Sequence, residues 1–317
     1  MTGYGLLSPP LLSRSTVERS EPVRADRARQ QQLWPAARVL LLDPYGRTPV
    51  RDGVLVLRPA VEIADEPPAE AVLLGESAGT VYWAVPGDRA GQVAGEHWRD
   101  LRGCGAELDD TGAGLLTTAV AVLGWHARAG FCASCGGRTE PRAAGWARYC
   151  LRCHHEEYPR TDPSIICLVH DAEDRHVLLA RQPSWPQGRF SLLAGFVEAG
   201  ESLEACVARE VLEEVGLQVR DVRYLGSQPW PFPRSLMIGF TAVADRYAPV
   251  RPVDGEIAQT RWVSRDELRA ALDAGAWSHR DGSVHGGGPD LGRSLVLPPE
   301  VSIARWMLDA WTTTAGS

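Results

Sequence analysis

Four cysteines in two pairs constrain the fold of this 317-residue chain more than any other feature. Cys132 and Cys135 form one C-x2-C pair, and Cys150 and Cys153 form a second pair after fourteen intervening residues. Each pair can direct two thiolates at one ion, and together they supply the four sulfur ligands of a closed tetrahedral zinc site. We therefore predict a zinc ribbon over residues 131–157. Its single structural Zn²⁺ would have no open coordination position for catalysis.

The remaining composition is that of an ordinary globular protein. The seven cysteines are an odd number and no secretion signal is recognised, so we expect reduced thiols and a cytoplasmic location. No apolar run reaches the roughly 18–20 residues of a membrane-spanning helix, so we expect no membrane partner. The net charge of −7 argues against nucleic-acid binding through overall charge. All 33 basic residues are arginine, so basic contacts to phosphate would be guanidinium contacts.

Hydrophobic patterning divides the chain into four expected parts. Residues 1–30 are polar and Arg- and Ser-rich, which predicts a flexible leader. Residues 31–130 alternate short strand-like runs with turns before a helical stretch, which predicts a mixed, β-rich N-terminal domain. The ribbon follows. In residues 158–317 strand patterns alternate with helices, so the expected fold class is α+β or α/β. The glycine-rich segment 282–292 is expected to be a loop.

A helix is expected at Ser202–Val215, directly after a glycine-containing turn. Ser202 is a suitable N-cap and Gly216 a suitable stop. Val211, Leu212 and Val215 are expected to pack the helix against the core.

The acidic residues of this helix indicate a metal site. Glu210 and Glu214 lie about 40° apart on one helical face, where like charges repel unless a cation lies between them. Oxygen ligands favour Mg²⁺ or Mn²⁺. Arg209 stands four residues before Glu213 and can pair with it. On charge alone, a solvated acidic helix explains the pattern equally well.

A second chemical signal begins ten residues after Leu217, in the sequence SQPWPFPRSLM at 227–237. Three prolines within five positions stiffen this segment into an extended loop. Trp230 and Phe232 would then be presented with little entropy left to lose, as suits stacking on a nucleobase or a nicotinamide ring. The alternative is a proline-rich strand end whose aromatic rings pack in the core.

The sequence GFVEAGESLEACVAREVLEEVGL at 195–217 resembles the Nudix box at every fixed position. The proline–aromatic segment, the upstream ribbon, YPR at 158–160, DGE at 254–256 and SIAR at 302–305 resemble the NADH pyrophosphatase branch of that superfamily. The resemblance covers about residues 130–312. It implies an α/β/α sandwich in the C-terminal domain and a homodimer. It also implies hydrolysis of NADH, and less efficiently NAD, to nicotinamide mononucleotide and AMP. Some members remove the NAD cap from RNA.

The resemblance also implies roles for particular residues. Glu210, Glu214 and Glu256 would hold Mg²⁺ or Mn²⁺ together with the Ala194 carbonyl. Glu214 is a candidate base. The expected catalytic set is Glu214, Glu213, Glu210 and Arg209. The expected substrate-binding residues are Tyr158, Phe196, Gln228, Pro229, Trp230, Pro231, Phe232, Pro233, Arg234, Ser235, Ala304 and Arg99. Some relatives carry an acid before the ribbon tryptophan. Gly145 stands there in this chain, which leaves that contact in question.

Two other functions are compatible with parts of the sequence. The first is a broader Nudix hydrolase of ADP-ribose, ADP-sugars or dinucleoside polyphosphates, against which the proline–aromatic segment argues. The second is a nucleotide-sensing, nucleic-acid-binding module, with ribbon arginines (Arg138, Arg142, Arg148 and Arg152) on RNA phosphates. Retention of all the box carboxylates argues against such a sensor. The physiological substrate, the phosphorus attacked and the number of catalytic metals are left open by the sequence.

Overall fold

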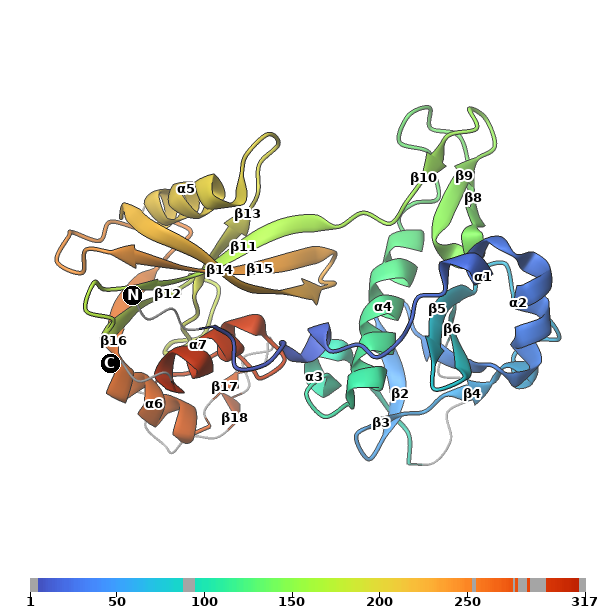
Figure 1. Ribbon diagram of the computed structural model, residues 1–317, viewed down its shortest axis with the longest axis horizontal. Helices are drawn as coiled ribbons and strands as arrows, with labels where there is room; N and C mark the ends of the chain where they lie inside the picture. The colour runs from blue at the N-terminus through green and yellow to red at the C-terminus, as the bar shows by residue number, and fades with distance from the viewer. Residues whose placement is uncertain are drawn as a thin grey trace. The chain divides into compact units, whose positions relative to one another are not determined.

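The computed structural model describes residues 5–87, 95–252, 255–275, 277–278, 284–285 and 295–313. Contacts divide the chain into two compact units, each described by itself (Figure 1). Unit 1 comprises Met1–Leu11, Asp162–Gln228 and Leu236–Ser317, and unit 2 comprises Leu12–Thr161 and Pro229–Ser235. Most of the loop expected at 282–292 lies outside the described residues. No helix in the described ranges is long and apolar enough to cross a membrane.

Unit 1 is built on one sheet with the strand order β14-β15-β11-β12-β16, and β13 pairs with β11. β11 and β12 form an antiparallel hairpin around residues 171–174, with His170 opposite Val177. The strands are β11 (Asp162–His170), β12 (His176–Arg181), β13 (Leu193–Phe196), β14 (Val219–Trp230), β15 (Ser235–Ala244) and β16 (Gln259–Ser264). A two-stranded pair, β17 (Trp277–Ser278) and β18 (Val284–His285), also belongs to this unit.

Alternation along β11 places apolar side chains on both faces of this sheet. Ile165, Cys167 and Val169 belong to the core cluster that contains the apolar residues of α5. Ile166 and Leu168 belong to the cluster that contains those of α6 and α7. Figure 1 accordingly shows α5 on one side of the sheet and α6 and α7 on the other. The expected α/β/α sandwich is confirmed. The helices are α5 (Leu203–Val215), α6 (Arg265–Asp273) and α7 (Ile303–Thr313).

A polar contact attaches α7 to the turn between β11 and β12. Asp174 accepts hydrogen bonds from Trp311 Nε1 at 2.6 Å and from Arg265 Nη2 at 2.8 Å. Trp311 is fully buried, so its indole N–H needs this partner. The contact joins residues 137 positions apart.

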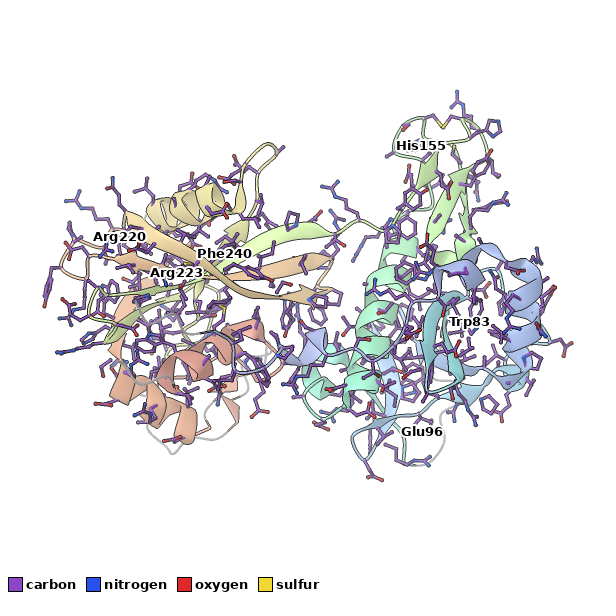
Figure 2. The ribbon with its side chains drawn as sticks, in the orientation of Figure 1. Trp83, Glu96, His155, Arg220, Arg223 and Phe240 are labelled. Atoms are coloured by element: carbon purple, nitrogen blue, oxygen red, sulfur yellow. The ribbon has the colours of Figure 1, made fainter. Side chains whose placement is uncertain are left out.

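Unit 2 contains a four-stranded sheet of order β4-β1-β6-β5 and a three-stranded sheet of order β3-β2-β7. β1 and β6 are parallel, whereas β5 and β6 are antiparallel, which confirms a mixed, β-rich N-terminal domain. Trp34 and Trp83 pack edge to face in its core, with ring centroids 5.5 Å apart (Figure 2 labels Trp83). The strands are β1 (Arg38–Leu42), β2 (Arg47–Arg51), β3 (Val54–Leu55), β4 (Arg58–Pro59), β5 (Val72–Ser77), β6 (Thr80–Pro86) and β7 (His97–Asp100).

Helices and the ribbon complete unit 2. α4 packs against β1, β5 and β6, and the ribbon sheet has the order β10-β9-β8. The segment expected as a leader contains short helices, and Thr16 Oγ1 lies 2.6 Å from Thr111 Oγ1. The bounds are η1 (Leu11–Ser13), α1 (Glu21–Ala25), α2 (Arg27–Leu33), η2 (Trp34–Ala36), η3 (Ala60–Glu62), α3 (Leu101–Cys104), α4 (Asp110–His126), β8 (Thr139–Arg142), η5 (Ala143–Gly145), β9 (Ala147–Cys150) and β10 (Glu156–Glu157).

Candidate functional site

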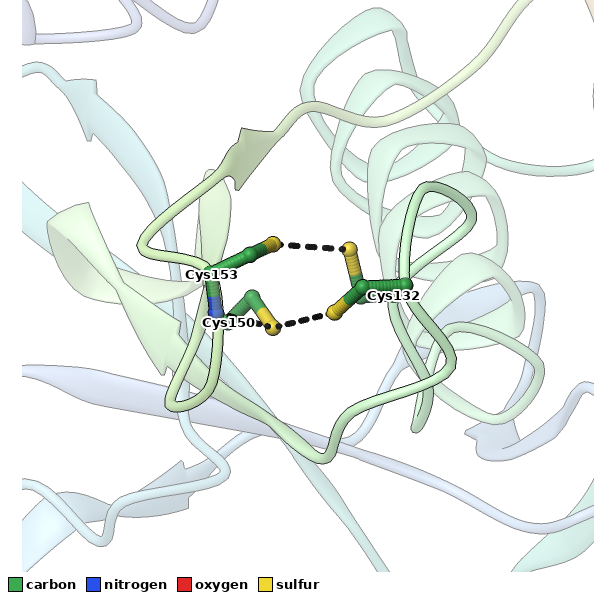
Figure 3. Close-up of side chains that lie close together, drawn as sticks. Cys132, Cys150 and Cys153 are labelled. Atoms are coloured by element: carbon green, nitrogen blue, oxygen red, sulfur yellow. Dashed lines mark hydrogen bonds between the residues drawn. The ribbon is translucent and has the colours of Figure 1, made fainter.

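The four cysteines of the ribbon form a site that fits zinc. The Sγ atoms of Cys132 and Cys153 lie 3.7 Å apart, and those of Cys135 and Cys150 lie 3.5 Å apart (Figure 3). A tetrahedron with Zn–S bonds of about 2.3 Å has sulfur–sulfur edges of about 3.8 Å. A Cβ on Gly137 would come within 3.1 Å and 3.3 Å of two of these sulfurs, so glycine makes room for the cluster. The donors and their spacing match the predicted structural Zn²⁺.

Helix α5 begins and ends where the sequence predicted. Ser202 Oγ accepts a hydrogen bond from the Ala205 N–H at 3.2 Å, and Gly216 closes the helix with φ of 74°. Its packing face was predicted wrongly at one position, because Leu212 is 48% exposed whereas Glu214 is only 7% exposed. Strand β13 packs against α5, and the Ala194 backbone of that strand forms a hydrogen bond with Glu214.

Gly195 of β13 lies directly against the Glu210 carboxylate. A Cβ built on Gly195 would be 1.8 Å from the carboxyl carbon and 2.0 and 2.2 Å from its two oxygens. Only a residue without a side chain allows the carboxylate to occupy this position. Because a loop joins β13 to α5, this contact holds the Glu210 carboxylate of the helix against the strand that precedes it.

Glu214 is a buried carboxylate without a complete set of partners. Its Oε2 atom is buried and has no hydrogen-bond donor. Burial, followed by the charges of Glu210 and Glu256, raises the pKa of Glu214 to about 8, although a backbone hydrogen bond with Ala194 opposes this shift. The structure therefore places Glu214 near Glu210, Glu256 and the Ala194 backbone, the other three residues predicted to hold Mg²⁺ or Mn²⁺.

The donor set fits a hard cation. All its atoms are oxygens, and an unpaired buried carboxylate is costly unless a positive charge compensates it. Burial also raises the pKa of Glu210. Glu256 is exposed. Within the described ranges, only the four cysteines gather three or more ligand atoms within 4.8 Å of one another, so the carboxylates are more widely spaced.

Arg209 holds the loop that precedes α5. Its Nε and Nη2 atoms donate to the two oxygens of Glu201 at 2.8 and 2.9 Å, and Nη1 donates to Glu210 and Glu213 at 3.0 Å. Nη2 also donates to the Phe196 carbonyl at 2.9 Å. The hydrogen bond from Arg209 lowers the pKa of Glu201 to about 2. Glu201 was absent from the predicted site, although its fixed place in the box spacing was a signal.

Three predicted substrate residues of unit 1 differ in accessibility. Phe196 is 56% exposed, as a stacking partner should be. Gln228 is fully buried, its Nε2 donates to the Val301 carbonyl at 3.0 Å, and its buried Oε1 has no donor. Ala304 is 1% exposed at the start of α7, and its N–H donates to Ser302 Oγ at 3.3 Å.

The proline–aromatic segment is partly strand and partly turn. β14 continues to Trp230 and β15 begins at Ser235, so the expected loop is reduced to the four residues between them. Pro229, Trp230, Phe232 and Arg234 are half-buried, Pro231 and Ser235 are buried, and Pro233 is exposed. The rings of Trp230 and Phe232 meet edge to face with centroids 4.9 Å apart.

Two arginines of the N-terminal domain have different surroundings. Arg99 forms a two-point ion pair with Glu107, at 2.5 and 2.7 Å. The Arg102 guanidinium instead lies 3.9 Å from the centroid of the Phe232 ring and 5.7 Å from that of Trp230. Arg99 was predicted from the sequence as a substrate residue and Arg102 was not, although both lie within residues 98–102.

Two further positions in unit 2 bear on the substrate predictions. Tyr158 is 64% exposed. A Cβ on Gly145 would lie 2.7 Å from Val72 Cγ2 and 3.0 Å from Val72 Cα, and the φ of Gly145 is 86°. This backbone leaves no room for an acidic side chain at position 145.

Comparison with known families assigns most of the chain. Residues 20–125 match an NADH pyrophosphatase-like rudimentary NUDIX domain, residues 127–158 an NADH pyrophosphatase zinc ribbon domain, and residues 160–283 a NUDIX domain.

Two of the similar proteins match nearly the whole length of this chain. A protein named NAD-capped RNA hydrolase NudC from Mycobacterium bovis is 49% identical, over 97% of this chain and 96% of its own. The protein of that name from Mycobacterium tuberculosis is 48% identical over the same shares. The one from Stutzerimonas stutzeri is 40% identical over 69% of this chain and 78% of its own. A crystal structure of a NUDIX hydrolase from Nitrosomonas europaea covers 43% of this chain and 78% of its own, with 25% identity and a TM-score of 0.36. This chain belongs to the Nudix hydrolase superfamily, in its zinc-ribbon NADH pyrophosphatase branch.

Proposed function

We propose that this enzyme hydrolyses the pyrophosphate of NADH and NAD to nicotinamide mononucleotide and AMP, and that it accepts NAD at the 5′ end of RNA. The observation that carries the proposal is the buried Glu214 carboxylate, which lacks a donor at Oε2 and lies near Glu210 and Glu256. Similarity to NAD-capped RNA hydrolases over 97% of the chain supports the substrate class.

The carboxylates of Glu210, Glu214 and Glu256, with the Ala194 carbonyl, would hold Mg²⁺ or Mn²⁺. Such ions neutralise charge on pyrophosphate oxygens and lower the pKa of a water molecule. Gly195 contributes by leaving space for Glu210 against β13. Arg209 contributes by fixing Glu201, Glu213 and the Phe196 carbonyl, which sets the shape of the loop.

In the proposed reaction, the oxygen of a water molecule bonds to one phosphorus, and the bond from that phosphorus to the bridging oxygen breaks. Glu214 is our candidate acceptor for the proton of the water, because its Oε2 receives no hydrogen bond from the protein. Glu213 is 57% exposed and is held by Arg209, so we assign it an orienting role. The leaving phosphate carries the electron pair of the broken bond.

For the substrate, we propose contacts with Gln228 through Ser235, with Tyr158, and with the Ala304 backbone. Phe196 and Trp230 are proposed to stack on a ring. Arg99 would have to leave Glu107 to reach a phosphate, so its role in substrate binding depends on that ion pair opening. We also propose a structural role for Zn²⁺, a homodimer and a cytoplasmic location. Light scattering after size exclusion chromatography tests the dimer.

Product analysis tests the proposed function. The purified protein with Mn²⁺ or Mg²⁺ is given NADH, NAD, ADP-ribose and a short NAD-capped RNA in parallel, with Glu210→Gln as the inactive control. We expect AMP and reduced nicotinamide mononucleotide from NADH, and 5′-monophosphate RNA from the capped RNA. Preference for ADP-ribose would contradict the substrate assignment. Binding of nucleotide without hydrolysis of any substrate would favour a sensor.

A further inference from the structure

The Arg102 guanidinium lies over the two aromatic rings of the proline–aromatic segment, Trp230 and Phe232. It lies 3.9 Å from the Phe232 ring centroid and 5.7 Å from the Trp230 centroid. The two rings contact each other edge to face at 4.9 Å. Arg102 and these rings belong to the same compact unit, although 128 positions separate Arg102 from Trp230 in the sequence.

A cation over one face of an aromatic ring draws on the negative charge of that face. A ring that already makes one cation–π contact attracts a second cation less strongly, and the two positive charges also repel each other. The nicotinamide ring of NAD carries a positive charge, whereas that of NADH is neutral. An arginine held at this aromatic pair therefore disfavours NAD relative to NADH.

We propose that Arg102 determines specificity for the redox state of the dinucleotide, by lowering the binding of the oxidised, cationic nicotinamide relative to the reduced, neutral ring. This inference rests on the proposed function, in which the proline–aromatic segment receives the dinucleotide. Arg102 acts through Phe232 and Trp230, so it is a positioning residue.

The charged residues nearest to Arg102 in the sequence, Arg99 and Asp100, form contacts with groups other than these rings. The Arg99 guanidinium is compensated by the Glu107 carboxylate at 2.5 and 2.7 Å. Asp100 caps α3 by accepting from the Gly103 N–H at 2.8 Å. Of Arg99 and Arg102, only Arg102 lies over the rings of Trp230 and Phe232. We therefore expect substitution of Arg102, and not of Arg99, to change the preference between NADH and NAD.

The test compares kcat/KM for NADH and NAD in Arg102→Gln, Arg102→Lys and wild type. We expect the NADH:NAD ratio to fall about threefold or more in Arg102→Gln, the range expected from one exposed cation–π contact. Arg102→Lys keeps the charge and should retain the ratio within about twofold. The matched control is Arg142→Gln, because Arg142 also lies over a ring, 5.2 Å from the Tyr149 centroid in the ribbon. Its ratio should not change.

Two further measurements keep the inference open to refutation. If Arg102→Gln does not fold, wild type is tested on nicotinic acid adenine dinucleotide, whose ring carboxylate cancels the pyridinium charge. We expect its kcat/KM to exceed that of NAD by about threefold or more. If wild type shows no turnover, the proposed function fails. Dissociation constants of NADH and NAD, measured by calorimetry, then test Arg102 separately.

Specific results would overturn the inference. One is an unchanged NADH:NAD ratio in folded Arg102→Gln. Equal losses of kcat/KM for NADH and NAD would show that Arg102 only stabilises the proline–aromatic segment. Equal NADH:NAD ratios in Arg102→Gln and Arg102→Lys would exclude the charge of Arg102 as the cause. The inference would also be refuted if wild type did not hydrolyse nicotinic acid adenine dinucleotide faster than NAD. Equal dissociation constants of wild type for NADH and NAD would refute it as well.

Discussion

Substitution of Gly195 by alanine is the most direct test of how strand β13 positions the Glu210 carboxylate, which we propose binds metal. The added Cβ would stand 1.8 Å from the Glu210 carboxyl carbon. Ordinary van der Waals contact begins at 3.4 Å, so the carboxyl carbon has to move by about 1.6 Å. The carboxylate is the end of a flexible side chain, and the backbone of Gly195 lies outside the left-handed region. The fold can therefore accommodate the change.

The expected consequence is loss of turnover without loss of stability. Misplacement of a catalytic group by about 1 Å can cost roughly 100-fold in rate, so we expect kcat to fall at least that far. The free energy of unfolding should change by no more than about 1 kcal/mol, since alanine is at least as favourable as glycine within a strand.

The assay pairs steady-state NADH hydrolysis at saturating Mn²⁺ with a thermal melt. Gly124→Ala is the control, because Gly124 lies within α4 and a Cβ there meets nothing within 4 Å. Retention of more than about a tenth of wild-type kcat in Gly195→Ala would show that turnover does not depend on the space that Gly195 leaves for Glu210. A melting temperature lowered by about 6 °C or more would also contradict the prediction, because the activity loss would then come from unfolding.

Three other predictions concern the carboxylate pair, the ribbon and the C-terminal helix. Glu214→Gln should abolish turnover while the fold persists; kcat above about a tenth of wild type would show that Glu214 is not essential. Cys150→Ser should release zinc and lower the melting temperature by about 6 °C or more. A zinc content, measured by atomic absorption, and a melting temperature equal to those of wild type would exclude a structural zinc site. Asp174→Ala leaves the buried Trp311 indole N–H without its acceptor, so the free energy of unfolding measured in urea should fall by about 1–3 kcal/mol. Asp174→Asn keeps an acceptor oxygen and should lose less. Equal losses in the two variants would show that this hydrogen bond does not stabilise the fold.

The sequence predicted the positions of the chemical groups better than their environments. Spacing alone located the zinc ligands and the helix with its N-cap and stop, because these depend on local geometry. It misjudged which residues of α5 are buried. Leu212 is exposed and Glu214 is buried, contrary to what helical periodicity favoured. Burial depends on which segment covers the helix, and β13 was not predicted to do so.

Local chemistry therefore determined much of this protein from its sequence: a four-sulfur zinc site, a capped acidic helix and a stiff segment with two aromatic rings. Only tertiary structure decided how these groups contact residues far away in the chain. It placed the Glu210 carboxylate on Gly195 and the Arg102 guanidinium on Phe232. Sequence patterns report periodicity and backbone preference along the chain. Close approach between separated segments is set by packing, which no local pattern encodes.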